Sequence, residues 1–230
     1  MLIDKYEFNQ DKCWYNKVCN KYNTDVCRMN CPRYLQMYYL FNQAGIPEVM
    51  QYPKPLYPDS RDLDQFQRLA EIKNDIVNWV QGGNSLYIFS TICGNGKTSW
   101  AIKLMSKYFD CIWPGNGYEC RGLFIRCGQL LNRAKRAING NDEKWPEYLE
   151  TIRKCDLVVW DDIGEYSLSV FDQQLLIELI DDRKYSGKAN IFTSNVIDEV
   201  LEANVGKRIA SRVCNGSEVV EFIGNDRRGE

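Results

Sequence analysis

The chain has 230 residues, of which 44% are hydrophobic, and it carries 29 Lys and Arg against 31 Asp and Glu. This length and composition predict one sizeable α/β domain with a small appendage, or two small domains, and the near-neutral charge excludes a global attraction to DNA or acidic membranes. Histidine is absent, which excludes histidine-based triads, histidine-containing zinc sites and imidazole acid–base catalysis.

The amino-terminal part of the chain differs in composition from the rest. Residues 1–50 are aromatic, rich in cysteine and without clear periodicity, and residues 51–60 (QYPKPLYPDS) contain three prolines. We expect a small domain over 1–50, an extended linker over 51–60 and the main domain over 61–230. The first residues lack the apolar run of a signal peptide, and no window approaches the roughly 20 apolar residues of a membrane helix. A cytoplasmic protein without membrane contact is therefore expected.

Four cysteines in this segment form a candidate metal site. Cys13, Cys19, Cys27 and Cys31 are separated by five, seven and three residues. Four thiolates suit a tetrahedral zinc ion. A bound metal ion would also stabilise a segment of about 50 residues, which buries little surface by itself. The alternative is reduced cysteines packed in a small aromatic core, since the common two-residue spacing is missing.

Beyond the linker, helices and strands are predicted to alternate. Helical spacing runs from Leu63 to Val80 and ends at Gly82 and Gly83. Strands are predicted at 85–90, 123–126, 156–160, 190–195 and 218–223, and further helices after Thr98 and near 128–139, 145–154, 168–185 and 206–213. This order predicts an α/β fold with a parallel sheet between helices.

Residues 91–98, TICGNGKT, follow a predicted strand and open a predicted helix. They match the phosphate-binding loop G-x-x-x-x-G-K-[ST] at every position except the first, where Thr91 replaces glycine. In such a loop backbone N–H groups surround the phosphates, Lys97 reaches the terminal phosphates and Thr98 holds Mg²⁺. A threonine forced into a left-handed conformation costs about 1–2 kcal/mol, so Thr91 puts the nucleotide affinity in question.

Polar groups that complete a nucleotide site follow later strands. Asp161 and Asp162 end the apolar run LVVW, and Asn195 ends NIFTSN. Each alone is compatible with a surface turn. Together with the loop, Asp161 is predicted to bind Mg²⁺ and Asp162 to act as a base or to orient water. Arg208 and Arg212 lie four residues apart on one helical face, as either a solvated basic face or an arginine finger for a neighbouring subunit.

The order GNGKTS, LVVWDDIG, IFTSN and GKRIASRV resembles the AAA+ ATPases of the bacterial and phage helicase-loader family, the DnaC and DnaI proteins. The resemblance covers residues 61–230, and IstB-type transposition ATPases share the same core. It implies a P-loop AAA+ fold, ATP or ADP with Mg²⁺ as ligands, and weak hydrolysis of ATP to ADP and phosphate. It also implies a zinc-binding amino-terminal domain in some members.

The resemblance also implies roles for individual residues. The phosphate loop, or Walker A motif, would bind nucleotide through six residues: Gly94, Asn95, Gly96, Lys97, Thr98 and Ser99. Asp161 and Asp162 would form Walker B, Asn195 sensor 1 and Arg208 the arginine finger. Arg212 is a second candidate for sensing phosphate.

A loader places a hexameric replicative helicase on single-stranded DNA during DNA replication, so the resemblance implies both as partners, with residues 1–50 gripping the helicase. Self-association, or an oligomer templated by the helicase, would bring Arg208 to a neighbouring site. DNA contact would involve a local set such as Arg133, Lys135 and Arg136, for which a solvated helix face is the alternative. The length suits a phage-encoded protein acting in host cytoplasm. Two other functions stay open: a nucleotide-binding module that sequesters a replication protein without hydrolysis, and an IstB-like transposition ATPase.

Overall fold

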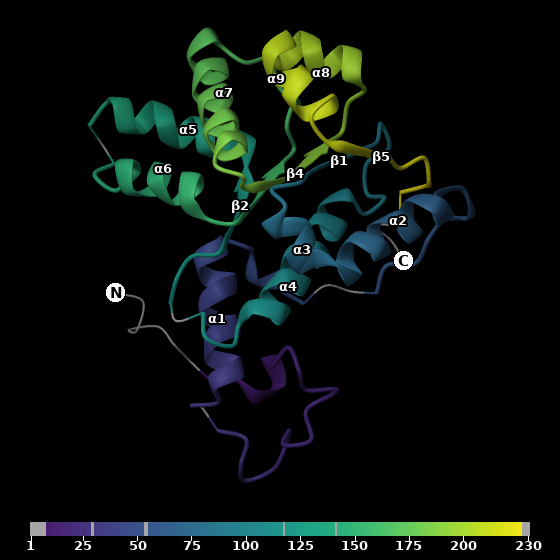
Figure 1. Ribbon diagram of the computed structural model, residues 1–230, viewed down its shortest axis with the longest axis vertical. Coiled ribbons are helices and arrows are strands. Elements are labelled where there is room, and N and C mark those ends of the chain that lie inside the picture. The colour runs from purple at the N-terminus through teal and green to yellow at the C-terminus, as the bar shows by residue number, and fades with distance from the viewer. Residues whose placement is uncertain (1–7, 29, 53–54, 117, 141, 227–230) are drawn as a thin grey trace.

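The computed structural model describes residues 8–28, 30–52, 55–116, 118–140 and 142–226. Their five strands form one parallel sheet of order β2-β3-β4-β1-β5. The strands are β1 (Ser85–Phe89), β2 (Gly122–Arg126), β3 (Leu157–Asp161), β4 (Ala189–Ser194) and β5 (Glu218–Glu221). The sheet lies between two layers of helices, which confirms the predicted α/β class (Figure 1).

Alternation along the central strand explains why both faces of the sheet are covered. Leu86 and Ile88 of β1 belong to one hydrophobic cluster, whereas Tyr87 and Phe89 belong to the other. Successive side chains of a strand point to opposite faces, so a strand that is apolar throughout needs helices on both sides. All five residues of β3 are likewise buried.

Each face has its own set of helices. The first face is covered by α1 (Pro32–Ala44), α2 (Leu63–Asn74), α3 (Ile76–Gln81) and α4 (Lys97–Ile112). The second is covered by α5 (Cys127–Ile138), α6 (Trp145–Lys154), α7 (Val170–Tyr185), α8 (Asp198–Val205) and α9 (Lys207–Cys214). Short 3-10 turns lie at Gln10–Lys12, Glu48–Met50 and Ser60–Asp62. Within the described residues no helix is long and apolar enough to cross a membrane.

Three elements differ from the sequence-based expectations. The helix expected from Leu63 to Val80 is divided at Asp75, whose φ of −111° and ψ of 28° interrupt it. α8 lies where no helix was predicted. The amino-terminal segment, expected to be irregular, contains α1, which begins with Pro32 and is followed by Gly45 in a left-handed conformation. Proline is common at the first position of a helix, and glycine is common just after its end.

The amino-terminal segment shares the hydrophobic core of the main domain. Phe41 of α1 packs edge-on against Phe109 of α4, with ring centroids 5.7 Å apart. The Asp110 carboxylate accepts hydrogen bonds from the Tyr15 hydroxyl at 2.7 Å and from Arg33 at 2.9 Å. A separate amino-terminal domain is therefore not confirmed. Residues 1–7 of that predicted domain, 53–54 of the predicted linker and 227–230 of the main domain lie outside the described residues.

Candidate functional site

The strand order brings four chain segments to one edge of the sheet. The carboxyl ends of β1, β4, β3 and β2 follow one another there, because this is their order in the sheet. The phosphate loop follows β1, Asn195 follows β4, Asp161 ends β3 and Arg126 ends β2. Ligand sites of open parallel sheets lie at this edge.

The phosphate loop places its left-handed conformations at glycines. Gly94 has a φ of 76° and Gly96 a φ of 102°. Among the described residues with side chains, a positive φ occurs at Asn23 and Asp162 and not at Thr91. The strain considered for Thr91 therefore does not arise, and the threonine is compatible with the loop conformation.

Hydrogen bonds from side chains stabilise the conformation of the phosphate loop. The Ser90 Oγ accepts hydrogen bonds from Asn95 Nδ2 at 2.6 Å and from the Ile92 amide at 3.0 Å. The Lys97 ammonium donates to the Ile92 carbonyl at 3.0 Å and to Asn95 Oδ1 at 3.2 Å. Asn95 is buried, so it supports the loop conformation and does not face the cavity in front of the loop.

Asp161 connects the phosphate loop to two strands. Its Oδ1 accepts hydrogen bonds from the Thr98 hydroxyl and the Thr193 hydroxyl, both at 2.8 Å. Burial, and then the charge of Asp162, raise the pKa of Asp161, whereas the two hydroxyl hydrogen bonds oppose this shift. A carboxylate beside a threonine hydroxyl at a helix N-terminus is an oxygen set that suits Mg²⁺.

Asp162 is held in an unusual backbone conformation. Its φ is 57°, a left-handed value that is uncommon for a residue with a side chain. The Asp162 amide donates to the Thr193 hydroxyl at 3.1 Å, and Asn195 Nδ2 donates to the Asp162 carboxylate at 3.0 Å. The predicted Walker B and sensor 1 residues are therefore in direct contact.

These groups line a cavity of about 550 Å³ in front of the loop, a size typical of ligand pockets. The predicted residues that line it are Gly94, Gly96, Lys97, Thr98, Ser99, Asp161, Asp162 and Asn195. Left-handed glycines, a lysine and a helix N-terminus fit phosphates, and Thr98 with Asp161 fits Mg²⁺. The cavity thus suits a magnesium nucleotide.

Four further lining residues were not predicted: Met50, Cys93, Arg126 and Glu165. Arg126 and Glu165 had a signal in the sequence, because each is a charged residue at or just beyond the carboxyl end of a strand. Met50 had none, since it comes from the amino-terminal segment and only the tertiary packing brings it to the loop.

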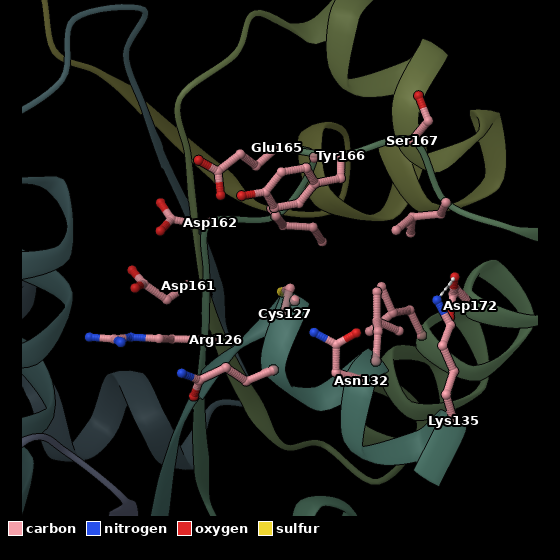
Figure 2. A pocket seen from close by; sticks show the side chains of 17 residues that line it. Arg126, Cys127, Asn132, Lys135, Asp161, Asp162, Glu165, Tyr166, Ser167 and Asp172 are labelled. Atoms are coloured by element: carbon pink, nitrogen blue, oxygen red, sulfur yellow. Dashed lines mark ion pairs between the residues drawn. The ribbon is translucent and has the colours of Figure 1, made fainter. Parts of the chain in front are cut away.

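A second cavity, of about 500 Å³, adjoins the first. The two share Arg126, Asp161, Asp162 and Glu165. Figure 2 shows the charged ends of these four side chains on one side, turned away from the part of the cavity lined by α5 and α7. The shared wall is therefore charged.

Comparison with known proteins places this chain in a family. Residues 39–228 match the family of IstB-like ATP binding proteins. The chain belongs to that family. No curated protein matches it at a significant level.

Solved structures with the same fold include replication proteins. The DnaC helicase loader has 20% identity and a TM-score of 0.59, over 72% of this chain and 93% of that one. DnaI has 19% identity and a TM-score of 0.59, over 80% of this chain and 94% of that one. The replication initiator DnaA bound to AMPPCP and single-stranded DNA has 18% identity and a TM-score of 0.59, over 77% of this chain and 53% of that one. At these identities the likeness concerns the fold.

In this IstB-like protein the two predicted arginines of α9 are not at the cavity. Arg208 is exposed. Arg212 forms an ion pair with Asp181 of α7, with Nη2 2.8 Å from Oδ2, and donates to the Arg208 carbonyl at 2.9 Å. Neither arginine lines the cavity of its own chain. A role for Arg208 in a neighbouring subunit stays a prediction.

The predicted DNA-contacting set on α5 is partly neutralised by nearby acids. Arg133 pairs with Asp142 and lies over the Tyr148 ring, 4.1 Å from its centroid. Lys135 pairs with Asp172 at 3.1 Å. Arg136 is exposed.

The four cysteines of the predicted zinc site lie in the amino-terminal segment. Among the residues that the structure describes, no group of three or more His, Cys, Asp or Glu is arranged to hold a metal ion. Cys13 and Cys19 pack against the hydrophobic cluster under the sheet. Burial raises the pKa of Cys13, and the nearby Cys31, Cys19 and Cys27 add to this shift. The four cysteines thus lie in one region, and zinc binding stays a prediction.

Proposed function

We propose that this chain is an ATP-dependent loader of a hexameric replicative helicase onto single-stranded DNA. The observation that carries the proposal is the cavity that gathers Lys97, Thr98, Asp161, Asp162 and Asn195. The chain belongs to a family of ATP-binding proteins. The fold of the chain matches most of the DnaC and DnaI structures. These similarities support a replication role.

The side chains of the cavity have different proposed roles in ATP hydrolysis. Lys97 neutralises phosphate charge, while Thr98 and Asp161 would hold Mg²⁺, which supplies charge neutralisation when bound. Asp162 accepts the proton of the attacking water, or orients that water. Its contact with the Asn195 amide at 3.0 Å fixes the carboxylate for this task.

Partner binding is assigned to the surfaces outside the cavity. Residues 1–50 are proposed to contact the helicase, and Arg208 to reach the nucleotide site of a neighbouring subunit in a self-associated or helicase-templated oligomer. Zinc bound by Cys13, Cys19, Cys27 and Cys31 would stabilise the first of these surfaces. Metal analysis of the purified full-length chain tests this point, and less than one zinc per chain contradicts it.

The test of the function is reconstitution with the helicase of the same replication system. With ATP, the chain is expected to bind the helicase in gel filtration and to increase its loading on circular single-stranded DNA. Lys97→Ala is expected to reduce ATP turnover by about 100-fold or more, because the lysine is part of the transition-state charge stabilisation. Failure to bind the helicase with either ATP or ADP contradicts the loader. Equal turnover by wild type and Lys97→Ala contradicts the ATPase.

A second candidate is a transposition ATPase, which the match to IstB-like ATP binding proteins favours. This function predicts assembly on double-stranded DNA and stimulation of a transposase. Two of the three basic residues considered for DNA contact, Arg133 and Lys135, are paired with acids, which argues against the more basic surface that assembly on double-stranded DNA requires. Double-stranded DNA that increases ATP turnover more than the helicase does would support the transposition ATPase instead.

A further inference from the structure

Arg126 occupies a distinctive place at the edge of the sheet. It is the last residue of β2, the one exposed residue of that strand, and it lies in register with Asp161 of β3. Within the described residues its guanidinium has no ion pair or hydrogen bond, although its charge acts to lower the pKa of the neighbouring Asp161 carboxyl. Most other described arginines, including Arg121 and Arg133, pair with a carboxylate. Arg126 is therefore a cation available to an anionic ligand.

The charges of the nucleotide cavity indicate what this cation does there. The cavity is lined by two cations, Lys97 and Arg126, and by three carboxylates, Asp161, Asp162 and Glu165. The carboxylates repel a phosphate chain that enters the cavity, and a protein cation on their side reduces this repulsion in addition to the Mg²⁺ that Thr98 and Asp161 would hold. Lys97 belongs to the phosphate loop and donates to a carbonyl of that loop at 3.0 Å. Arg126 is the lining cation on the carboxylate side.

The strand order sets which phosphate Arg126 can meet. Along the sheet edge the phosphate loop of β1 is followed by Asn195 after β4, the two aspartates after β3, and then Arg126 on β2. Phosphates bound by the loop would lie at the β1 end of this row. In the proposed mechanism the terminal phosphate would face Asp162 and Asn195, which places it toward the side of the cavity lined by Arg126.

We propose that Arg126 contacts the terminal phosphate of the nucleotide within its own chain and thereby makes the site prefer a nucleoside triphosphate to a diphosphate. This inference rests on the proposed nucleotide site and adds a residue that determines specificity. A guanidinium suits the task because its planar donors bind two phosphate oxygens at once, whereas an ammonium acts as a point charge. Arg126 differs from Arg208 in acting without a neighbouring subunit.

The test compares the binding of AMPPCP and ADP by calorimetry in the presence of Mg²⁺, so that no turnover is needed. Arg126→Ala is expected to weaken AMPPCP binding by about tenfold or more and ADP binding by less than about threefold. Arg126→Lys is expected to recover part of the AMPPCP affinity. Arg68→Ala is the matched control, because Arg68 is an exposed arginine of α2 that lines neither cavity.

Three results would overturn the inference. Equal losses for AMPPCP and ADP in Arg126→Ala indicate a general charge effect without contact to the terminal phosphate. Unchanged binding of both indicates that Arg126 does not reach the nucleotide. Both results leave the proposed nucleotide site intact. A wild-type chain that binds neither nucleotide overturns that site, and the inference with it. Unfolding curves of the variants are expected to match wild type, since Arg126 is exposed.

Discussion

At the scale of single residues, the site stores backbone strain at Asp162. Its φ of 57° places a side chain in the left-handed region, at the position where the proposed mechanism needs a carboxylate. Such strain costs about 1–3 kcal/mol and persists only where surrounding contacts impose it. The Asp162 amide bonded to Thr193 and the carboxylate bonded to Asn195 supply those contacts. The left-handed conformation of Asp162 therefore lowers the stability of the fold and positions the carboxylate.

Replacement of Asp162 by glycine is predicted to separate stability from activity. Asp162→Gly removes the left-handed strain, so the free energy of unfolding should stay within about 1 kcal/mol of wild type or rise. ATP turnover should fall to the level of Lys97→Ala because the carboxylate is gone. Urea unfolding and phosphate release measure the two effects. Asp162→Asn is the control, since asparagine tolerates the same φ but lacks the charge. A glycine variant that is clearly less stable than the asparagine variant would contradict stored strain.

The hydrogen bonds of Asp156 lead us to expect that the free energy of unfolding depends on pH. Burial raises the pKa of its carboxyl, but hydrogen bonds from Arg121, Tyr108 and Lys188 outweigh burial, so the net pKa is lowered. A lowered pKa stabilises the fold above the unfolded value of about 3.9, and this stabilisation is lost as the pH falls through the folded value. Asp156→Asn should therefore cost about 1–3 kcal/mol at pH 7. Urea unfolding at several pH values should show that this cost shrinks toward pH 3. If the loss of unfolding free energy in Asp156→Asn were the same at every pH, the result would contradict this prediction.

At the scale of elements, a buried arginine joins two helices to the sheet. Arg183 of α7 is fully buried. It donates to the carbonyls of Ile152 at 2.6 Å and Cys155 at 2.9 Å, and to the Asn190 side chain at 2.8 Å. These acceptors lie at the end of α6, before β3 and in β4. One side chain thus donates hydrogen bonds to carbonyl groups at the connection between α6 and β3.

Loss of Arg183 is predicted to destabilise this corner strongly. Arg183→Met removes a donor from several buried acceptors, of which Asn190 Oδ1 keeps its hydrogen bond from Trp160, and leaves a buried site shaped for a guanidinium, so a cost above about 3 kcal/mol is expected. Arg183→Lys should recover little, because a lysine cannot reproduce the planar set of donors. Arg153→Met is the control, as Arg153 bridges the same two helices through partly exposed ion pairs with Glu178 and Asp182. Its expected cost is below about 1 kcal/mol. Similar urea midpoints for Arg183→Met and Arg153→Met would contradict this prediction.

Among the helices and strands, some features could be predicted from the sequence and others could not. Strands such as β3 are short apolar runs, here LVVW followed by an aspartate, so their positions and parallel pairing follow from the local pattern. The motif residues that follow these strands were predicted together because strand ends meet at one edge of a sheet. The break at Asp75, the helix α8 and the contact of Met50 with the cavity were not predictable. They depend on tertiary packing, which local periodicity does not record.

At the scale of the whole molecule, the amino-terminal segment is part of the nucleotide-binding unit. Met37, Leu40 and Phe41 belong to the same hydrophobic cluster as α4, whose first residue is Lys97. Figure 1 shows α1 lying beside α4. The composition change near residue 50 therefore marks no break in packing. This shared cluster implies that a partner bound to the amino-terminal segment acts on a body that also carries the phosphate loop.

A shared core predicts one cooperative unfolding transition for the full chain. Phe41→Ala should lower the free energy of unfolding by about 3–5 kcal/mol, because it leaves a cavity between α1 and α4. The loss should appear equally in calorimetry and in the release of a bound fluorescent nucleotide. Val49→Ala is the matched control, since Val49 lies in the same segment but is 87% exposed, and its cost should stay within about 0.5 kcal/mol. Two separate transitions in wild type, with only the first moved by Phe41→Ala, would show that the segment folds as an independent domain. In that case nucleotide release should follow the second transition alone.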